Sequence, residues 1–202
     1  MPVQRGLDPA YPALSWGLNA SAQAPVDQAG LWRTIAGAVF ETPSAKGSIL
    51  CFRRDYPAEH LMQHPKQTTR SVLLAFQEQG LVTIVLSQRM GAQNRILAGC
   101  GWREGAGIDT SGRKMIPNFN KPAGFDCIVT VGDSAEEGGY VLIDPAQDGK
   151  SLTLFIQSPI TAENDSPRKA TGYNLTLGKE DRTFALTRID SKACQSFKAV
   201  TE

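Results

Sequence analysis

The sequence predicts an all-β protein, an antiparallel β-sandwich or a small β-barrel of about nine short strands with a short N-terminal helix. Three observations predict this fold. From residue 47 onward, short apolar runs rich in β-branched and aromatic residues alternate with polar turns. The 202 residues include 19 Gly and 12 Pro, as a fold with many chain reversals requires. Hardly any helical periodicity separates the runs, so consecutive strands are expected to pair antiparallel.

Residues 1–28 are expected to form a leader or a disordered tail that precedes a single β-rich domain over 29–202. Ala22-Gln23-Ala24 matches the small-residue pattern at a signal-peptide cleavage site. The apolar run before it is weak, and only Arg5 supplies positive charge ahead of it. The segment is therefore either the remnant of a signal peptide or a plain Ala/Pro-rich tail.

The first element expected after the leader is the short helix. Leu31, Ile35 and Val39 recur at helical spacing, and Asp27 is placed to cap the first turn.

Nine strands are expected after this helix. Two junctions predict hairpins, Glu78-Gln79-Gly80 and the Asp148-Gly149 turn, whose glycine suits a positive φ. The runs around 72–76 and 81–86 alternate poorly, which is typical of strands covered on both faces. The candidate strands lie within 47–54, 70–77, 81–89, 95–102, 126–132, 139–144, 151–157, 172–178 and 182–189.

Charge and hydropathy exclude several partners. With 21 basic and 20 acidic residues the chain carries no global field that would attract nucleic acid, although a local basic patch stays open. No run approaches the roughly 18 apolar residues of a membrane-spanning helix. We therefore expect no membrane span, no nucleic-acid partner, and a protein or a small molecule as the ligand.

The four cysteines predict disulfide bonds and an oxidising compartment, which is periplasmic or extracellular. Cys100 and Cys127 flank a Gly/Pro-rich loop, and closing it would stabilise the fold by about 3.6 kcal/mol. Cys51 and Cys194 would then pair and tie the first strand to the end of the last, as closing a barrel requires. Isolated buried thiols are the alternative. No two cysteines lie close enough in the sequence to indicate a zinc site.

Both histidines of the chain, His60 and His64, stand four residues apart. On a helix this spacing places them on one face, where Glu59 or Asp55 could join them in a metal site. Pro57 and Pro65 bracket the segment, and no H-E-x-x-H pattern is present. We predict a solvated helical turn without a metal, and no cofactor.

Gly132-Asp133-Ser134 follows a predicted strand and resembles, over three residues, the nucleophile segment of chymotrypsin-like proteases. The resemblance implies a triad of His60 or His64 with Asp109 and Ser134. Ala135 stands where that family has glycine, and a polar turn between strands is the simpler interpretation. A hydrolase that uses a serine and a histidine is therefore the alternative to a non-enzymatic protein.

The loop from Gly101 to Gly124 is the predicted recognition surface, because structureless loops longer than about 15 residues in compact domains are usually functional or disordered. It carries two aromatic side chains that could anchor a partner, Trp102 and Phe119. It also carries two arginines, Arg103 and Arg113, whose guanidinium groups can donate paired hydrogen bonds. The sequence thus predicts an exported, non-enzymatic β-domain that binds a protein or a small ligand through surface loops.

Overall fold

The structure is a computed structural model. It describes residues 49–77, 80–108, 111–117, 119, 123–130, 138–146, 149–164 and 172–197. The expected leader and the helix expected after Asp27 lie outside the described residues.

The fold is a closed antiparallel β-barrel of eight strands with two additional strands, which confirms the predicted all-β class and selects the barrel over the sandwich. Around the barrel the order is β3-β2-β1-β10-β7-β6-β5-β4, and pairing between β3 and β4 closes it. The barrel strands are β1 (Leu50–Asp55), β2 (Thr69–Phe76), β3 (Leu81–Gln88), β4 (Gln93–Glu104), β5 (Ala123–Val129), β6 (Tyr140–Pro145), β7 (Ser151–Ile156) and β10 (Thr183–Ile189).

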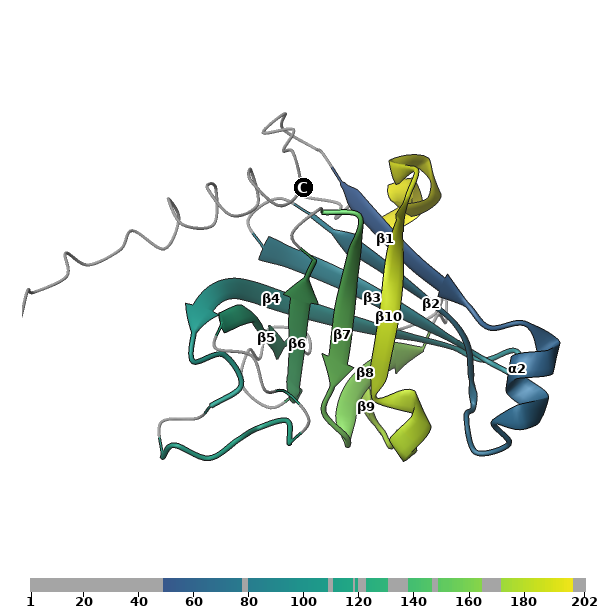
Figure 1. Ribbon diagram of the computed structural model, residues 1–202, viewed down its shortest axis with the longest axis horizontal. Helices are drawn as coiled ribbons and strands as arrows, with labels where there is room; N and C mark the ends of the chain where they lie inside the picture. Colours follow the sequence, from purple (N-terminus) through teal and green to yellow (C-terminus); the bar gives the residue numbers. More distant parts are fainter. Residues whose placement is uncertain are drawn as a thin grey trace, which may run out of the picture.

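The two sides of the barrel cross at a steep angle. In Figure 1, β6, β7 and β10 run upright across the front, while β2, β3 and β4 pass behind them. Strand β4 is long enough to serve both sides, because its first half pairs with β3 and its second half with β5. One continuous sheet therefore wraps around a single core.

Large apolar side chains fill the interior of the barrel. Inward-facing residues alternate along each strand and form one buried cluster. Its largest fully buried members include Phe52, Phe125, Phe184, Leu74, Ile84, Leu86, Ile96, Ile143, Leu154 and Ile156. The interior is thus a packed core, as in other barrels of about eight strands.

The strand expectations hold for nine of the ten strands, and both predicted hairpins join strands that pair, β2 with β3 and β6 with β7. Gly149 adopts the expected positive φ of 65°. Residues 82–87 of β3 are buried without interruption, as the poor alternation of this run predicted.

The strand that the sequence did not indicate is β8 (Ile160–Asn164). It is short, half polar and preceded by Pro159, so it has neither the length nor the apolar density of the other runs. It forms a hairpin with β9 (Gly172–Leu175) and extends the sheet beside the start of β4. The hydroxyl of Tyr173 donates a hydrogen bond to Oδ1 of the buried Asn94 and so ties this hairpin to the barrel.

Among the described residues, three short helical segments lie outside the strands, α2 (Ala58–Gln63), η2 (Lys179–Asp181) and η3 (Ser191–Phe197). The α2 segment contains His60, and His64 is its C-cap residue, so the predicted helical turn is confirmed. None of the helices in the described part of the chain is long and apolar enough to cross a membrane.

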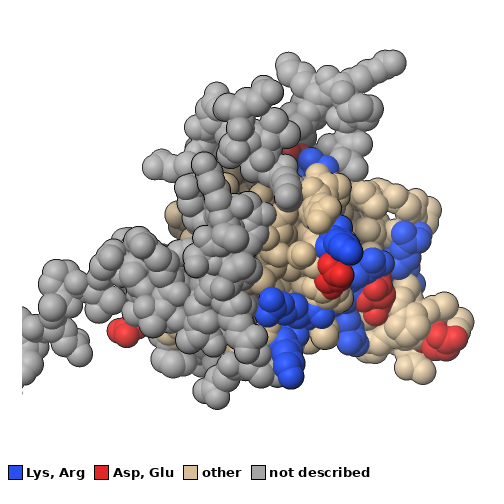
Figure 2. All heavy atoms as spheres, turned by 90° about the horizontal axis from the view of Figure 1, so that it is seen from above, with Lys and Arg blue, Asp and Glu red and all other residues tan. Residues whose placement is uncertain are grey.

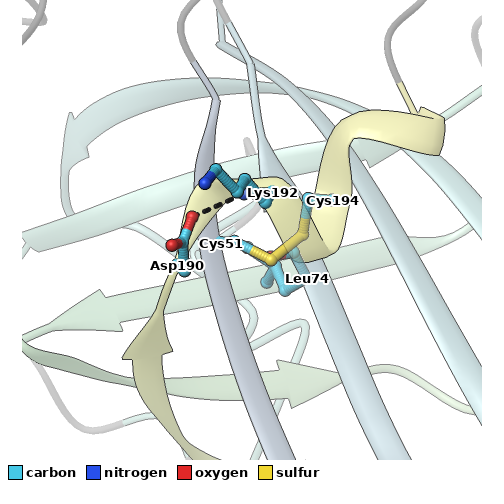
Figure 3. The surroundings of a disulfide bond; sticks show 5 residues. All are labelled: Cys51, Leu74, Asp190, Lys192 and Cys194. Carbon is cyan, nitrogen blue, oxygen red and sulfur yellow. Dashed lines mark hydrogen bonds between the residues drawn. A yellow bond between two sulfur atoms is a disulfide. The ribbon is translucent and has the colours of Figure 1, made fainter.

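The disulfide between Cys51 and Cys194 fastens η3 to the outer face of β1 (Figure 3). Cys51 and Cys194 are fully buried there with Ala75 of β2. Asp190 accepts a hydrogen bond from the backbone N–H of Lys192 at the start of η3. The pairing is the expected one and ties the first strand to the segment after the last. Hydrogen bonds between β1 and β10 already join these two strands, and the disulfide lies on the outer face of this junction.

Candidate binding surface

The second disulfide stands at the base of the predicted recognition loop. Cys100 of β4 and Cys127 of β5 are direct register partners, with Cα atoms 4.0 Å apart. Both expected cysteine pairs are therefore at disulfide distance. The strands extend beyond the cysteines to Glu104 and from Ala123, so the connection between them is shorter than the sequence suggested.

The described part of this connection packs against the barrel. Ala106, Ile116 and Phe119 are buried with Leu142 in a small cluster on the outer face of β6, and Phe155 of β7 packs against it. The loop therefore has an apolar core of its own, which the sequence analysis did not predict.

Two glycines allow the close approach of this loop. A Cβ atom on Gly107, which has a φ of 77°, would lie 2.6 Å from Cδ1 of Leu142. A Cβ on Gly124 would lie 3.0 Å from Cζ of Phe119 and 3.1 Å from the carbonyl oxygen of Ile143. Because any side chain would collide at these positions, glycine is required here for the loop to pack closely against the barrel.

The solvent side of the loop carries charged groups. Nη1 of Arg103 lies 3.3 Å from a carboxylate oxygen of Asp126, and its guanidinium lies 3.5 Å from the carbonyl oxygen of Ile108. An isolated β-bridge joins Ile108 to Lys114. Arg113 and Lys114 are exposed at the far side of this bridge.

The structure places the four predicted site residues in different surroundings. Arg103 and Arg113 are exposed. Trp102 is half-buried, and its ring meets Phe125 of the core edge to face at 5.1 Å. Trp102 thus faces the core side of β4, opposite to Arg103. Phe119 is only 4% exposed and anchors the loop to the barrel. We use the name loop platform for Arg103, Ile108, Arg113 and Lys114.

Sequence reasoning missed Ile108 and Asp126. Ile108 is 39% exposed beside the arginines, and Asp126 orients one of them. A signal for Asp126 was available, because alternation along β5 places it on the outer face between buried Phe125 and Cys127.

A second cluster surrounds the histidines. Tyr56, His60 and His64 stack in a row, with ring centroids 4.8 Å and 4.3 Å apart. The guanidinium carbon of Arg54 lies 5.3 Å from the centre of the Tyr56 ring. Burial raises the pKa of the Tyr56 phenol above its usual value, against the opposing effect of Arg54.

One hydrogen bond and one contact with a carboxylate hold the two imidazoles. Nε2 of His60 lies 3.0 Å from Oε1 of the buried Gln67, and Nδ1 of His64 lies 3.7 Å from Glu180. Within the described ranges, no three His, Cys, Asp or Glu side chains are grouped so that they could hold a metal ion.

The remaining members of the alternative catalytic triad, Asp109 and Ser134, lie outside the described residues, as do Asn118, Asn120 and Lys121 of the loop. No protein-family model, curated protein or solved structure matches this chain.

Proposed function

We propose that this protein is an exported, non-enzymatic binding domain that recognises a protein or a small ligand through the loop platform. The observation that carries the proposal is the anchoring of the platform. A disulfide stands at its base, and a buried apolar cluster holds it against β6 and β7. Binding residues on a rigid scaffold lose less conformational entropy when a partner binds.

The filled interior of the barrel favours recognition from outside. Phe52, Phe125 and Phe184 are each fully buried in the middle of the core. A ligand in the lumen would have to displace side chains of this kind, at a cost of several kcal/mol each. The outer surface is therefore the better place for a ligand.

The chemistry of the loop platform suits a partner with both acidic and apolar groups. The guanidinium groups of Arg103 and Arg113 can each donate two parallel hydrogen bonds to a carboxylate, and Ile108, which is exposed beside Arg103, offers apolar contact. Asp126 holds Arg103 in place, so less side-chain entropy is lost on binding.

Export is supported by the two cysteine pairs, since disulfides persist in oxidising compartments and are rare in reducing ones. Mass spectrometry of protein taken from its native cells without reduction should find Cys51–Cys194 and Cys100–Cys127 peptides. Four free thiols would contradict export.

Site-specific photocrosslinking tests the binding site. A photoreactive amino acid at Ile108 should yield an adduct from exported material of the native cells, and Arg103→Ala with Arg113→Ala should reduce it at least tenfold. Thr187, exposed on the outer face of β10, is the control position. Equal adducts from both positions, or an adduct that survives the double substitution, would place binding elsewhere.

A further inference from the structure

A second exposed feature lies where β1 leads into β2. The side chains of Met62 in α2 and Met90 in the β3–β4 turn are 73% and 95% exposed. The guanidinium of Arg89 donates hydrogen bonds to the carbonyl oxygens of Leu61 and His64, which joins the β3–β4 turn to α2. The two methionines therefore belong to one connected feature.

The α2 segment projects from the molecule, at the right-hand end of Figure 1. None of its residues is buried. The ring stack of Tyr56, His60 and His64 holds it from one side, and the hydrogen bond between His60 and Gln67 adds to this. These contacts hold the protruding α2 segment in place, and Met62 on this segment faces solvent.

The surroundings of the two methionines are basic. We define the α2 rim as residues 53–70, 88–92 and 178–182, which include seven basic and four acidic residues, whereas the whole chain has 21 and 20. Asp55 pairs with Arg53, and the buried Asp181 accepts three hydrogen bonds, so neither acid faces a partner freely. Besides the Arg53–Asp55 pair, the exposed cations are Arg54, Lys66, Arg70, Arg89 and Lys179, and the exposed acids are Glu59 and Glu180.

The right-hand part of the view in Figure 2 shows Lys and Arg side chains grouped together, with acidic side chains among them. The seven basic and four acidic residues of the α2 rim give it an excess of positive charge that the near-zero net charge of the whole chain conceals. The fold creates this excess by bringing together three segments that are far apart in the sequence, as the contact of His64 with Glu180 and the hydrogen bonds of Arg89 require.

We propose that the α2 rim binds the surface of an anionic lipid bilayer. Exposed methionines would enter the boundary between headgroups and acyl chains, while the cations would meet lipid phosphates. A bilayer also suits the convex shape, because it requires no complementary surface. A stable protein interface would bury about 800 Å² on each partner, far more than two isolated methionine side chains provide.

This surface is separate from the loop platform. The α2 segment connects β1 to β2, and the loop platform lies at the end of β4 and in the connection after it. Strand β4 runs antiparallel to β1 in the barrel. The two features therefore lie at opposite ends of the barrel (Figure 1). One surface can contact lipid while the other is occupied, and each proposal can fail without the other.

Co-sedimentation of the full chain with vesicles tests the proposal. The probes are vesicles of phosphatidylcholine alone and of phosphatidylcholine mixed with phosphatidylglycerol. Binding should require the anionic lipid and weaken as salt increases. Lys66→Gln with Lys179→Gln should lower partitioning about 30-fold, since each cation near an anionic surface contributes about 1 kcal/mol. Met62→Ser with Met90→Ser should lower it about tenfold through lost apolar burial.

A charge-matched control is Arg113→Gln with Lys114→Gln on the loop platform, which should leave partitioning unchanged. All substituted side chains are exposed, so each variant should keep the parental melting temperature, which is checked first. Absence of binding to anionic vesicles, or equal binding to both vesicle types, would overturn the proposal. A loss of binding in the control variant as large as in the rim variants would overturn it as well.

Discussion

Phe119 meets Phe155 edge to face, with ring centroids 5.3 Å apart and ring planes at 90°. One ring belongs to the β4–β5 connection and the other to the outer face of β7. Such aromatic pairs stabilise a contact by about 1 kcal/mol beyond the burial of their area. This pair therefore anchors a glycine-rich connection to the barrel wall.

Phe119→Ala should release this connection without unfolding the barrel. The substitution removes the largest side chain of the outer cluster, and we expect the free energy of unfolding to fall by about 2 to 4 kcal/mol. Hydrogen exchange at residues 105–108 and 111–117 should accelerate more than exchange in β2 and β3. Ile108→Ala, in the same loop but exposed, is the control and should cost less than about 1 kcal/mol. Unchanged exchange in Phe119→Ala would contradict this account.

Removing the disulfides in pairs should destabilise the protein to different extents. The loop-entropy estimate gives about 3.6 kcal/mol for the Cys100–Cys127 separation of 27 residues and about 5 kcal/mol for the Cys51–Cys194 separation of 143. Double Cys→Ala variants compared by urea unfolding should follow that order. The reverse order would mean that changes in native packing outweigh the loss of chain entropy.

Replacing Asp181 by asparagine, which has nearly the same shape, should destabilise the protein. Its buried carboxylate accepts hydrogen bonds from the backbone N–H groups of Thr68 and Thr69 and from the Thr68 hydroxyl. In Asp181→Asn the new amide group would face a donor, so we expect a loss of about 2 to 4 kcal/mol in urea unfolding. Glu180→Gln, the exposed neighbour, should cost less than about 1 kcal/mol. Similar losses in both variants would argue against the specific role of Asp181.

Stability should decrease at alkaline pH because of Tyr56 and Tyr173. Burial raises the pKa of both phenols above 10.0, so the folded protein holds these protons more tightly than the unfolded chain does. The contribution of these phenols to the free energy of unfolding is complete below about pH 10. It is lost as the pH rises through their higher pKa values in the folded protein. Urea unfolding between pH 8 and 11 should show this decrease, and Tyr56→Phe should make it smaller. An identical pH profile in Tyr56→Phe would exclude a contribution from Tyr56.

The strands were predictable because their signal is local. Leu81–Gln88 is a dense apolar run with a turn on either side, and such a run forms a strand wherever it lies in the sheet. Ile160–Asn164 was missed because it is short and partly polar, and it becomes a strand only through pairing with β4 and β9. The choice between sandwich and barrel also depended on a non-local pairing, that of the first strand, β1, with the last, β10.

The candidate binding surface was predictable in part. Arg103 and Arg113 are exposed as expected, but Phe119 and Gly107 belong to the support of the loop, because their partners Leu142 and Phe155 lie on strands that follow later in the chain. The α2 rim was beyond prediction for the same reason. Its cations come from three segments whose charges nearly cancel against the rest of the sequence.

The sequence by itself determined the all-β class, nine of the strands and two hairpins, because strand propensity and turn chemistry act within recognisable segments. It indicated the cysteine pairs but left isolated thiols as an alternative. Only the tertiary structure decided that the barrel closes and is filled, that the glycine-rich loop packs on its wall, and that basic residues gather beside Met62 and Met90. These features depend on contacts between residues that are distant in the chain, and a single sequence does not encode such contacts in any local pattern.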